Sequence, residues 1–122
     1  MAVHRLAELV KLLAEKTVEG RLLWEKTVEG EAFQTAFPGY SVRLRTQKSK
    51  SSRYPGADAY AIQIFNESGE LVEETTDEDL DGVDQPGEFF AVMREMHIEA
   101  RRSVMGVDKA IDSILEQLSS KR

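Results

Sequence analysis

The chain has 122 residues, a length typical of one domain, and we expect residues 1–122 to form a single domain. It contains no cysteine, which excludes disulfides, zinc–thiolate sites and thiol nucleophiles. A net charge of −6 argues against general binding to nucleic acid or anionic membranes, and no apolar run is long enough for a signal peptide or membrane span. We therefore expect a cytoplasmic protein.

A one-sided helix is expected at the start of the chain. Its apolar residues recur at three- and four-residue steps, namely Val3, Leu6, Leu9, Val10 and Leu13. The hexapeptide EKTVEG then occurs twice, at 15–20 and 25–30. The first copy places Gly20 where a left-handed residue would close the helix. The second copy predicts a strand end and the turn of a hairpin around Glu29 and Gly30, so the repeat is a coincidence of letters.

Strands are expected in the middle of the chain. Apolar residues alternate with polar or small ones through Phe33, Thr35, Phe37, Tyr40, Val42 and Leu44. We interpret 33–45 as one long strand that is kinked at Pro38–Gly39. Residues 46–57 lack periodicity and predict a mobile basic connection. Alternation resumes at Tyr60, and the turn residues 66–69 predict a tight hairpin.

The last third of the chain is predicted to be helical. Thr76 to Asp79 has the form of a capping box that opens a short turn, and Asp84-Gln85-Pro86 is expected to begin a longer helix. The apolar face of that helix runs from Phe89 to Gly106. A second stripe follows, formed by Val107, Ile111, Ile114, Leu115 and Leu118. The predicted fold class is α+β, with an N-terminal helix, a four-stranded antiparallel meander sheet, and two C-terminal helices packed on one face.

Catalytic motifs are scarce. The chain has no Gly-x-Ser-x-Gly elbow, phosphate-binding loop or dinucleotide fingerprint, and its histidines, His4 and His97, lie on separate predicted helices. We interpret His97 as a partly buried or rim histidine and Met93 and Met96 as core residues. We therefore expect that the protein is not an enzyme and has no cofactor.

The acidic linker at 76–88 contains a metal-loop pattern. Residues 77–88 follow Asp-x-Asp-x-Asp-Gly with a Glu five positions after the Gly, and they resemble the calcium loop of the EF-hand family. This resemblance implies a calcium site formed by Asp77, Asp79, Asp81, the Val83 carbonyl and Glu88. The pattern departs from the family at Asp84 and at Pro86–Gly87, and a strand precedes it. These departures favour a solvated acidic linker that caps helices.

A basic segment at 43–53 contains no acid. Its charged residues are Arg43, Arg45, Lys48, Lys50 and Arg53. A hairpin carrying them could follow a phosphate backbone, and meandering strands followed by a helix are similar in topology to the Whirly and purine-rich-element-binding folds, which bind single strands. The alternatives are a charged edge that blocks strand pairing, or attraction to the acidic tract of the same or a neighbouring chain.

Several large apolar residues lie outside the assigned stripes, namely Leu12, Leu23, Trp24, Phe65, Phe90 and Ile98. Self-association would bury them. We therefore expect a non-catalytic protein–protein interaction module, such as an adaptor, chaperone or inhibitor. It would form a homodimer and bind another protein through its sheet edge or helical face. Single-stranded nucleic-acid binding through 43–53 and calcium binding by 77–88 are the alternatives.

Overall fold

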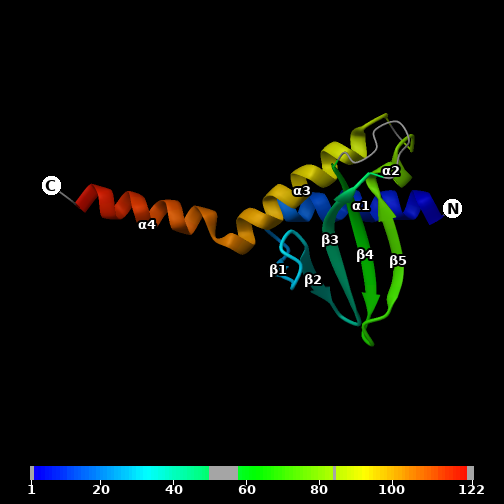
Figure 1. Ribbon diagram of the computed structural model, residues 1–122, viewed down its shortest axis with the longest axis horizontal. Coiled ribbons are helices and arrows are strands. Elements are labelled where there is room, and N and C mark those ends of the chain that lie inside the picture. The colour runs from blue at the N-terminus through cyan, green and yellow to red at the C-terminus, as the bar shows by residue number, and fades with distance from the viewer. Residues whose placement is uncertain (1, 50–57, 84, 121–122) are drawn as a thin grey trace.

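The computed structural model describes residues 2–49, 58–83 and 85–120, and it confirms the α+β class (Figure 1). The helices are α1 (Ala2–Val18), α2 (Asp77–Leu80), α3 (Glu88–Met105) and α4 (Val107–Ser120). The strands are β1 (Glu25–Lys26), β2 (Phe33–Phe37), β3 (Tyr40–Lys48), β4 (Asp58–Asn66) and β5 (Leu71–Thr76). They form one antiparallel meander sheet in the order β1-β2-β3-β4-β5.

The expected four strands are five because the predicted kink at Pro38–Gly39 is a hairpin turn. Phe37 pairs directly with Tyr40, so two residues reverse the chain between β2 and β3. Proline fixes φ at the first turn position, and Gly39 takes the positive φ of 80° that the second position needs. The prediction of one long kinked strand over 33–45 was therefore wrong.

The two copies of the hexapeptide have different structures, as predicted. The first copy completes α1, and Gly20 closes the helix with a φ of 75°. The second copy supplies β1 and the turn before β2, where the Thr27 hydroxyl accepts the Glu29 amide over 3.1 Å and donates to the Ala32 carbonyl over 2.9 Å. The same six residues thus adopt different structures because their neighbours in the chain and in space differ.

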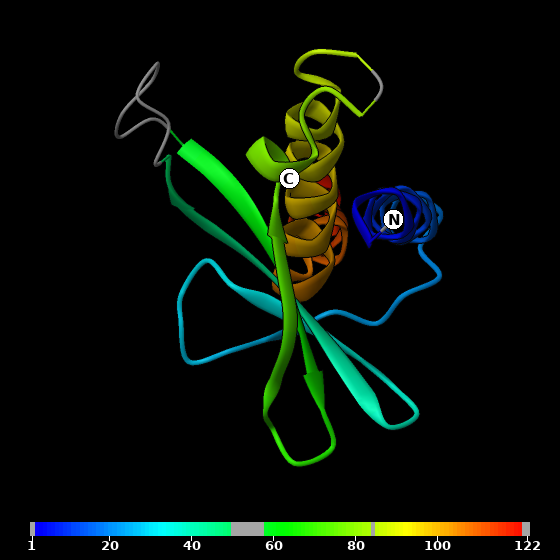
Figure 2. The same ribbon diagram turned by 90° about the vertical axis from the view of Figure 1, so that its right-hand side faces the viewer.

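Helix α3 packs on one face of the sheet and α1 packs on α3 (Figure 2). The sheet supplies its apolar face to this core because side chains alternate along each strand. The largest fully buried side chains are Phe33, Leu44, Ile62, Leu80, Phe89, Met93, Met96 and Val10. The opposite face of the sheet has no described helix over it (Figure 2).

The C-terminal segments follow the prediction in part. Thr76 and Asp79 form the expected capping box of α2. Helix α3 begins at Glu88 after Gly87, later than predicted, and Asp84 lies outside the described residues. Gly106 ends α3 with a φ of 65°, and α4 then extends away from the sheet (Figure 1). The helical cover of the sheet therefore comes from α3, and none of the α4 residues is buried.

The prediction of a mobile connection over 46–57 was wrong for its first residues. Residues 46–48 belong to β3 because Thr46, Gln47 and Lys48 pair with residues 60, 59 and 58 of β4. Residues 50–57 lie outside the described part of the chain.

Candidate functional site

The carboxylates of the acidic linker bind separate backbone groups. Asp77 Oδ1 accepts the Tyr60 amide over 2.7 Å, and Asp79 Oδ2 accepts the Thr76 amide over 3.1 Å. Asp81 accepts the Gly87 amide over 2.7 Å, and Glu88 accepts the Gln85 amide over 3.4 Å. Residues 77–80 form a helical turn. Asp79 therefore caps α2, as the favoured interpretation expects. Asp77 departs from that interpretation, because it is buried and binds an amide of β4.

The pattern at 77–88 does not assemble a cation site in the part of the chain that the structure describes. No group of three or more His, Asp or Glu side chains among these residues is arranged to hold a metal ion. The Val83 side chain packs against the hydrophobic core. Calcium binding by this loop therefore stays a prediction without geometric support.

Asp77 is the buried member of the acidic linker, with 6 % of its surface exposed. Burial raises the pKa of its carboxyl above the ordinary aspartate value, and the hydrogen bond from the Tyr60 amide opposes this shift in part. Asp77 thereby links α2 to β4, because its side chain takes the place of a strand partner for Tyr60.

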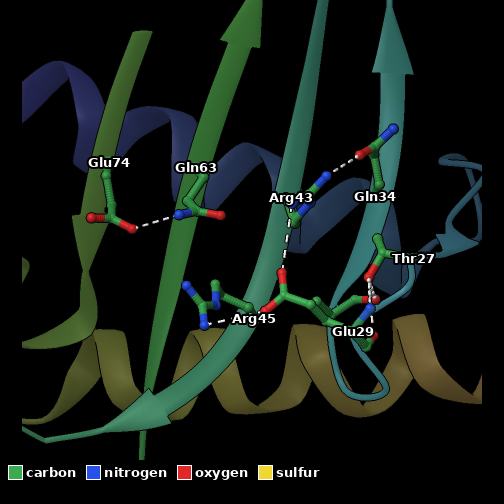
Figure 3. A network of polar contacts seen from close by, with 8 residues as sticks. Thr27, Glu29, Gln34, Arg43, Arg45, Gln63 and Glu74 are labelled. Carbon is green, nitrogen blue, oxygen red and sulfur yellow. Dashed lines mark hydrogen bonds and ion pairs between the residues drawn. The ribbon is translucent and has the colours of Figure 1, made fainter. Parts of the chain in front are cut away.

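The uncovered face of the sheet carries a polar network (Figure 3). A row of aligned side chains crosses β2 to β5, formed by Gln34, Arg43, Gln63 and Glu74. Arg43 Nη2 donates to Gln34 over 3.1 Å, and Gln63 donates to Glu74 over 2.8 Å. The Arg43 guanidinium also lies 4.9 Å from the centre of the Phe65 ring, so a cation–π contact partly covers that ring.

The two arginines of β3 share one carboxylate. Glu29, from the turn between β1 and β2, lies 3.6 Å from Arg43 Nη1 and 3.3 Å from Arg45 Nη2 (Figure 3). The Nε atoms of both arginines are buried, and neither has a hydrogen-bond partner among the described residues. Their positive charge is thus met within the chain by Glu29, not by the acidic linker.

The remaining basic residues of the segment 43–53 are Lys48, Lys50 and Arg53. Lys48 lies 3.3 Å from Asp58 across β3 and β4. Lys50 and Arg53 lie outside the described residues. The described basic side chains of this segment are therefore ion-paired, and nucleic-acid binding through 43–53 stays a prediction.

His97 is buried between α3 and the sheet, more deeply than predicted. Its Nε2 lies 2.8 Å from the Glu31 carbonyl oxygen, and its ring contacts Phe33 and Tyr60 at centroid distances of 5.2 and 5.5 Å. Met93 and Met96 are fully buried in the same core. The surroundings of His97 therefore serve packing.

Helix α4 carries an exposed apolar stripe. Its side chains Ile111, Ile114, Leu115 and Leu118 are 48–62 % exposed. These residues continue the three- and four-residue spacing of the core-facing side of α3, which includes Met93, Met96, Ala100 and Val104. Beyond Gly106 the pattern persists although the sheet and α1 no longer cover it (Figure 1).

The residues outside the predicted stripes divide into three groups. Trp24 was expected to need a partner chain, but it is 3 % exposed because α1 and the core enclose it, so that expectation was wrong. Phe65 is half-buried beneath Arg43. Four other side chains remain exposed, as expected: Leu12, Leu23, Phe90 and Ile98.

A groove of about 400 Å³ lies where α4 leaves the body of the protein. Its lining is mainly polar and charged, with a few apolar side chains among them, namely Val18, Leu22, Trp24 and Val107. Arg102 Nη2 donates to Asp108 over 2.7 Å and ties the end of α3 to the first turn of α4. The sequence does not indicate this groove, because its walls come from segments that are far apart along the chain.

No protein-family model matches this chain, and the comparisons with curated proteins and with solved structures gave no match either. Among the described residues, the helices are too short or too polar to cross a membrane.

Proposed function

We propose that this chain is a non-catalytic protein–protein interaction module that works as a homodimer, and that α4 is its docking element. The observation that carries the proposal is the uncovered apolar stripe of α4, formed by Ile111, Ile114, Leu115 and Leu118. A water-exposed stripe of this kind on a helix is typical of a surface that a partner helix covers. The absence of cysteine from the sequence supports a cytoplasmic setting.

A second copy of the chain is the occupant that the stripe favours. The residues Val107, Ile111, Ile114 and Leu118 follow one another at steps of four, three and four, which is the spacing of a helix-pairing seam. The sequence of steps is the same in both directions, so the stripe can align with that of a second copy related by two-fold symmetry. Contact with a different protein stays a prediction.

Light scattering coupled to gel filtration tests the proposal. The wild-type chain is expected to have twice its mass of 13.8 kDa. Ile114→Lys should give a monomer because it places a charge in the seam, whereas Ser113→Lys adds the same charge on the far side of α4 and should stay dimeric. A monomeric wild-type chain, or equal dimerisation of both variants, would refute the proposal.

Two further measurements separate the alternatives from this proposal. A nucleic-acid protein would retard labelled single strands, with affinity falling steeply as salt rises. A calcium protein would gain thermal stability with the ion and lose it in chelator. We expect neither effect.

A further inference from the structure

The two outermost strands of the described sheet differ in length. Strand β1 has two residues and β5 has six, so β5 presents the longer edge (Figure 1). The outer side of an edge strand carries backbone N–H and C=O groups with which a strand of another chain can pair. A very short strand limits such pairing, and this protects the β1 edge. The β5 edge needs another form of protection, because Leu71 and Val72 at its start are also exposed.

The register of β5 shows which of its residues bond to β4. In an antiparallel pair, the backbone groups of successive residues point alternately toward one neighbouring strand and away from it. The Tyr60 amide of β4 points to the β5 side, because it bonds to Asp77, the residue that follows β5. Two residues along β4, Ile62 points the same way and pairs with Thr75. Thr75 therefore turns its backbone groups inward to β4.

The residues on either side of Thr75 turn their amides to the free edge, and both amides are already bonded. The Glu74 amide donates to Glu73 Oε1 over 2.9 Å. The Thr76 amide donates to Asp79 Oδ2 over 3.1 Å, which is half of the capping box of α2. Two side-chain carboxylates thus occupy the outward donors that a pairing strand would use.

A third carboxylate closes the edge where β5 ends. The last pair of β4 with β5 joins Ala61 to Thr76, so Tyr60 has no residue of β5 opposite it. The Tyr60 amide donates instead to Asp77 Oδ1 over 2.7 Å, and Asp77 is buried. The exposed side of β4 next to α2 therefore offers no free amide at this position.

We propose that Glu73, Asp77 and Asp79, the closing carboxylates, shut the β5 edge of the sheet against strand addition. An incoming strand meets no free amide at Tyr60, Glu74 or Thr76, so its carbonyl oxygens would lose water without gaining a hydrogen bond. The inference gives the acidic residues around α2 a role that the calcium pattern does not explain. It goes beyond the proposed function, because it concerns the sheet edge and not α4.

Substitutions at Glu73 separate the hydrogen bond from the charge. Glu73→Ala removes the charge and the acceptor of the Glu74 amide, whereas Glu73→Gln removes the same charge and keeps an oxygen in place. Light scattering over a series of protein concentrations, with thioflavin T fluorescence as the probe for added β-structure, compares the variants with wild type. Glu73→Ala should assemble beyond the wild-type mass at a concentration at least about fivefold lower than wild type does. Glu73→Gln should match wild type.

Hydrogen exchange measured by NMR checks the closing bonds themselves. The Glu74 amide should exchange at least about tenfold more slowly in wild type and in Glu73→Gln than in Glu73→Ala. Asp79→Asn and Asp79→Ala give the same comparison for the Thr76 amide. Because Asp79→Ala also removes the capping box of α2, the two Glu73 variants decide the question.

Three results would overturn the closed edge. Equal assembly of Glu73→Ala and Glu73→Gln would mean that charge repulsion alone protects the edge. A Glu73→Ala variant that keeps the wild-type mass would mean that this carboxylate does not close it, and equal exchange of the Glu74 amide in all three proteins would mean that the bond is absent. Each of these results leaves a homodimer through α4 intact, and a monomeric wild-type chain leaves the closed edge intact.

Discussion

The indole nitrogen of Trp24 donates a hydrogen bond to the Thr17 hydroxyl over 3.0 Å. That hydroxyl in turn donates to the Leu13 carbonyl over 2.6 Å, so it serves the helix and the tryptophan together. Both side chains are buried, and the pair fixes the segment after α1 against the end of that helix. A residue of the first hexapeptide copy thereby supplies the polar partner that lets a large aromatic side chain enter the core.

We predict that Thr17→Val lowers the free energy of unfolding by about 1–3 kcal/mol, because the shape is kept while the buried indole N–H loses its acceptor. Urea unfolding followed by the fluorescence of Trp24, the single tryptophan of the chain, measures this. Leu23→Ala is the control: Leu23 is 75 % exposed, and its change should stay within about 0.5 kcal/mol. Equal midpoints for Thr17→Val and wild type would contradict the role of the hydroxyl.

A pH dependence is predicted for Asp77→Asn. Burial raises the pKa of the Asp77 carboxyl in the folded state above its unfolded value. Its stabilising contribution is therefore full below the unfolded pKa of about 3.9 and is lost as pH rises through the folded pKa. Asparagine does not titrate and still offers an oxygen to the Tyr60 amide. The stability of the variant relative to wild type should thus increase as pH rises through this window and then level off.

Unfolding by urea at a series of pH values checks the prediction for Asp77. Asp77→Ala is the matched control, since it removes the acceptor of the Tyr60 amide and should lower the free energy of unfolding by about 1–3 kcal/mol on the neutral side of the window. Parallel pH profiles for Asp77→Asn and wild type would show that Asp77 has an ordinary pKa.

Glu29→Gln is predicted to destabilise the protein by less than about 1 kcal/mol, because its ion pairs with Arg43 and Arg45 are partly exposed. Glu74→Gln is the control, since it removes the same charge from a contact with the neutral Gln63. The difference between the two variants should shrink when salt is raised to about 1 M, where the Debye length is about 3 Å. A difference that does not change with salt would mean that Glu29 acts through its shape.

Periodicity along the chain predicted most of the helices and strands. The stripe of α1, the alternation in β4 and the glycines that close α1 and α3 act within a few residues, so a local pattern describes them. Pro38–Gly39 was misread because a kink and a two-residue turn leave similar alternation on either side. Only the pairing of Phe37 with Tyr40 separates the two structures.

The candidate surface was predicted in outline. The apolar stripe of α4 was visible from its spacing, but its exposure depends on the direction that the chain takes after Gly106. Trp24 shows the opposite case: it is buried in the core, and its indole nitrogen finds a hydrogen-bond partner in Thr17 of α1. Contacts between segments that are distant in the chain decide which apolar residues stay exposed to water. The spacing of residues along the sequence does not reveal these contacts.

The meander order has a consequence for synthesis on the ribosome. Every sheet pairing joins strands that are consecutive in the chain, so the strands can associate in the order in which they emerge. Helix α1 differs, because α3, the helix on which it packs, is made after the whole sheet. While the sheet is being made, the nascent chain therefore carries the amphipathic helix α1 before the helix on which it packs exists. The core can close only after α3 has been synthesised.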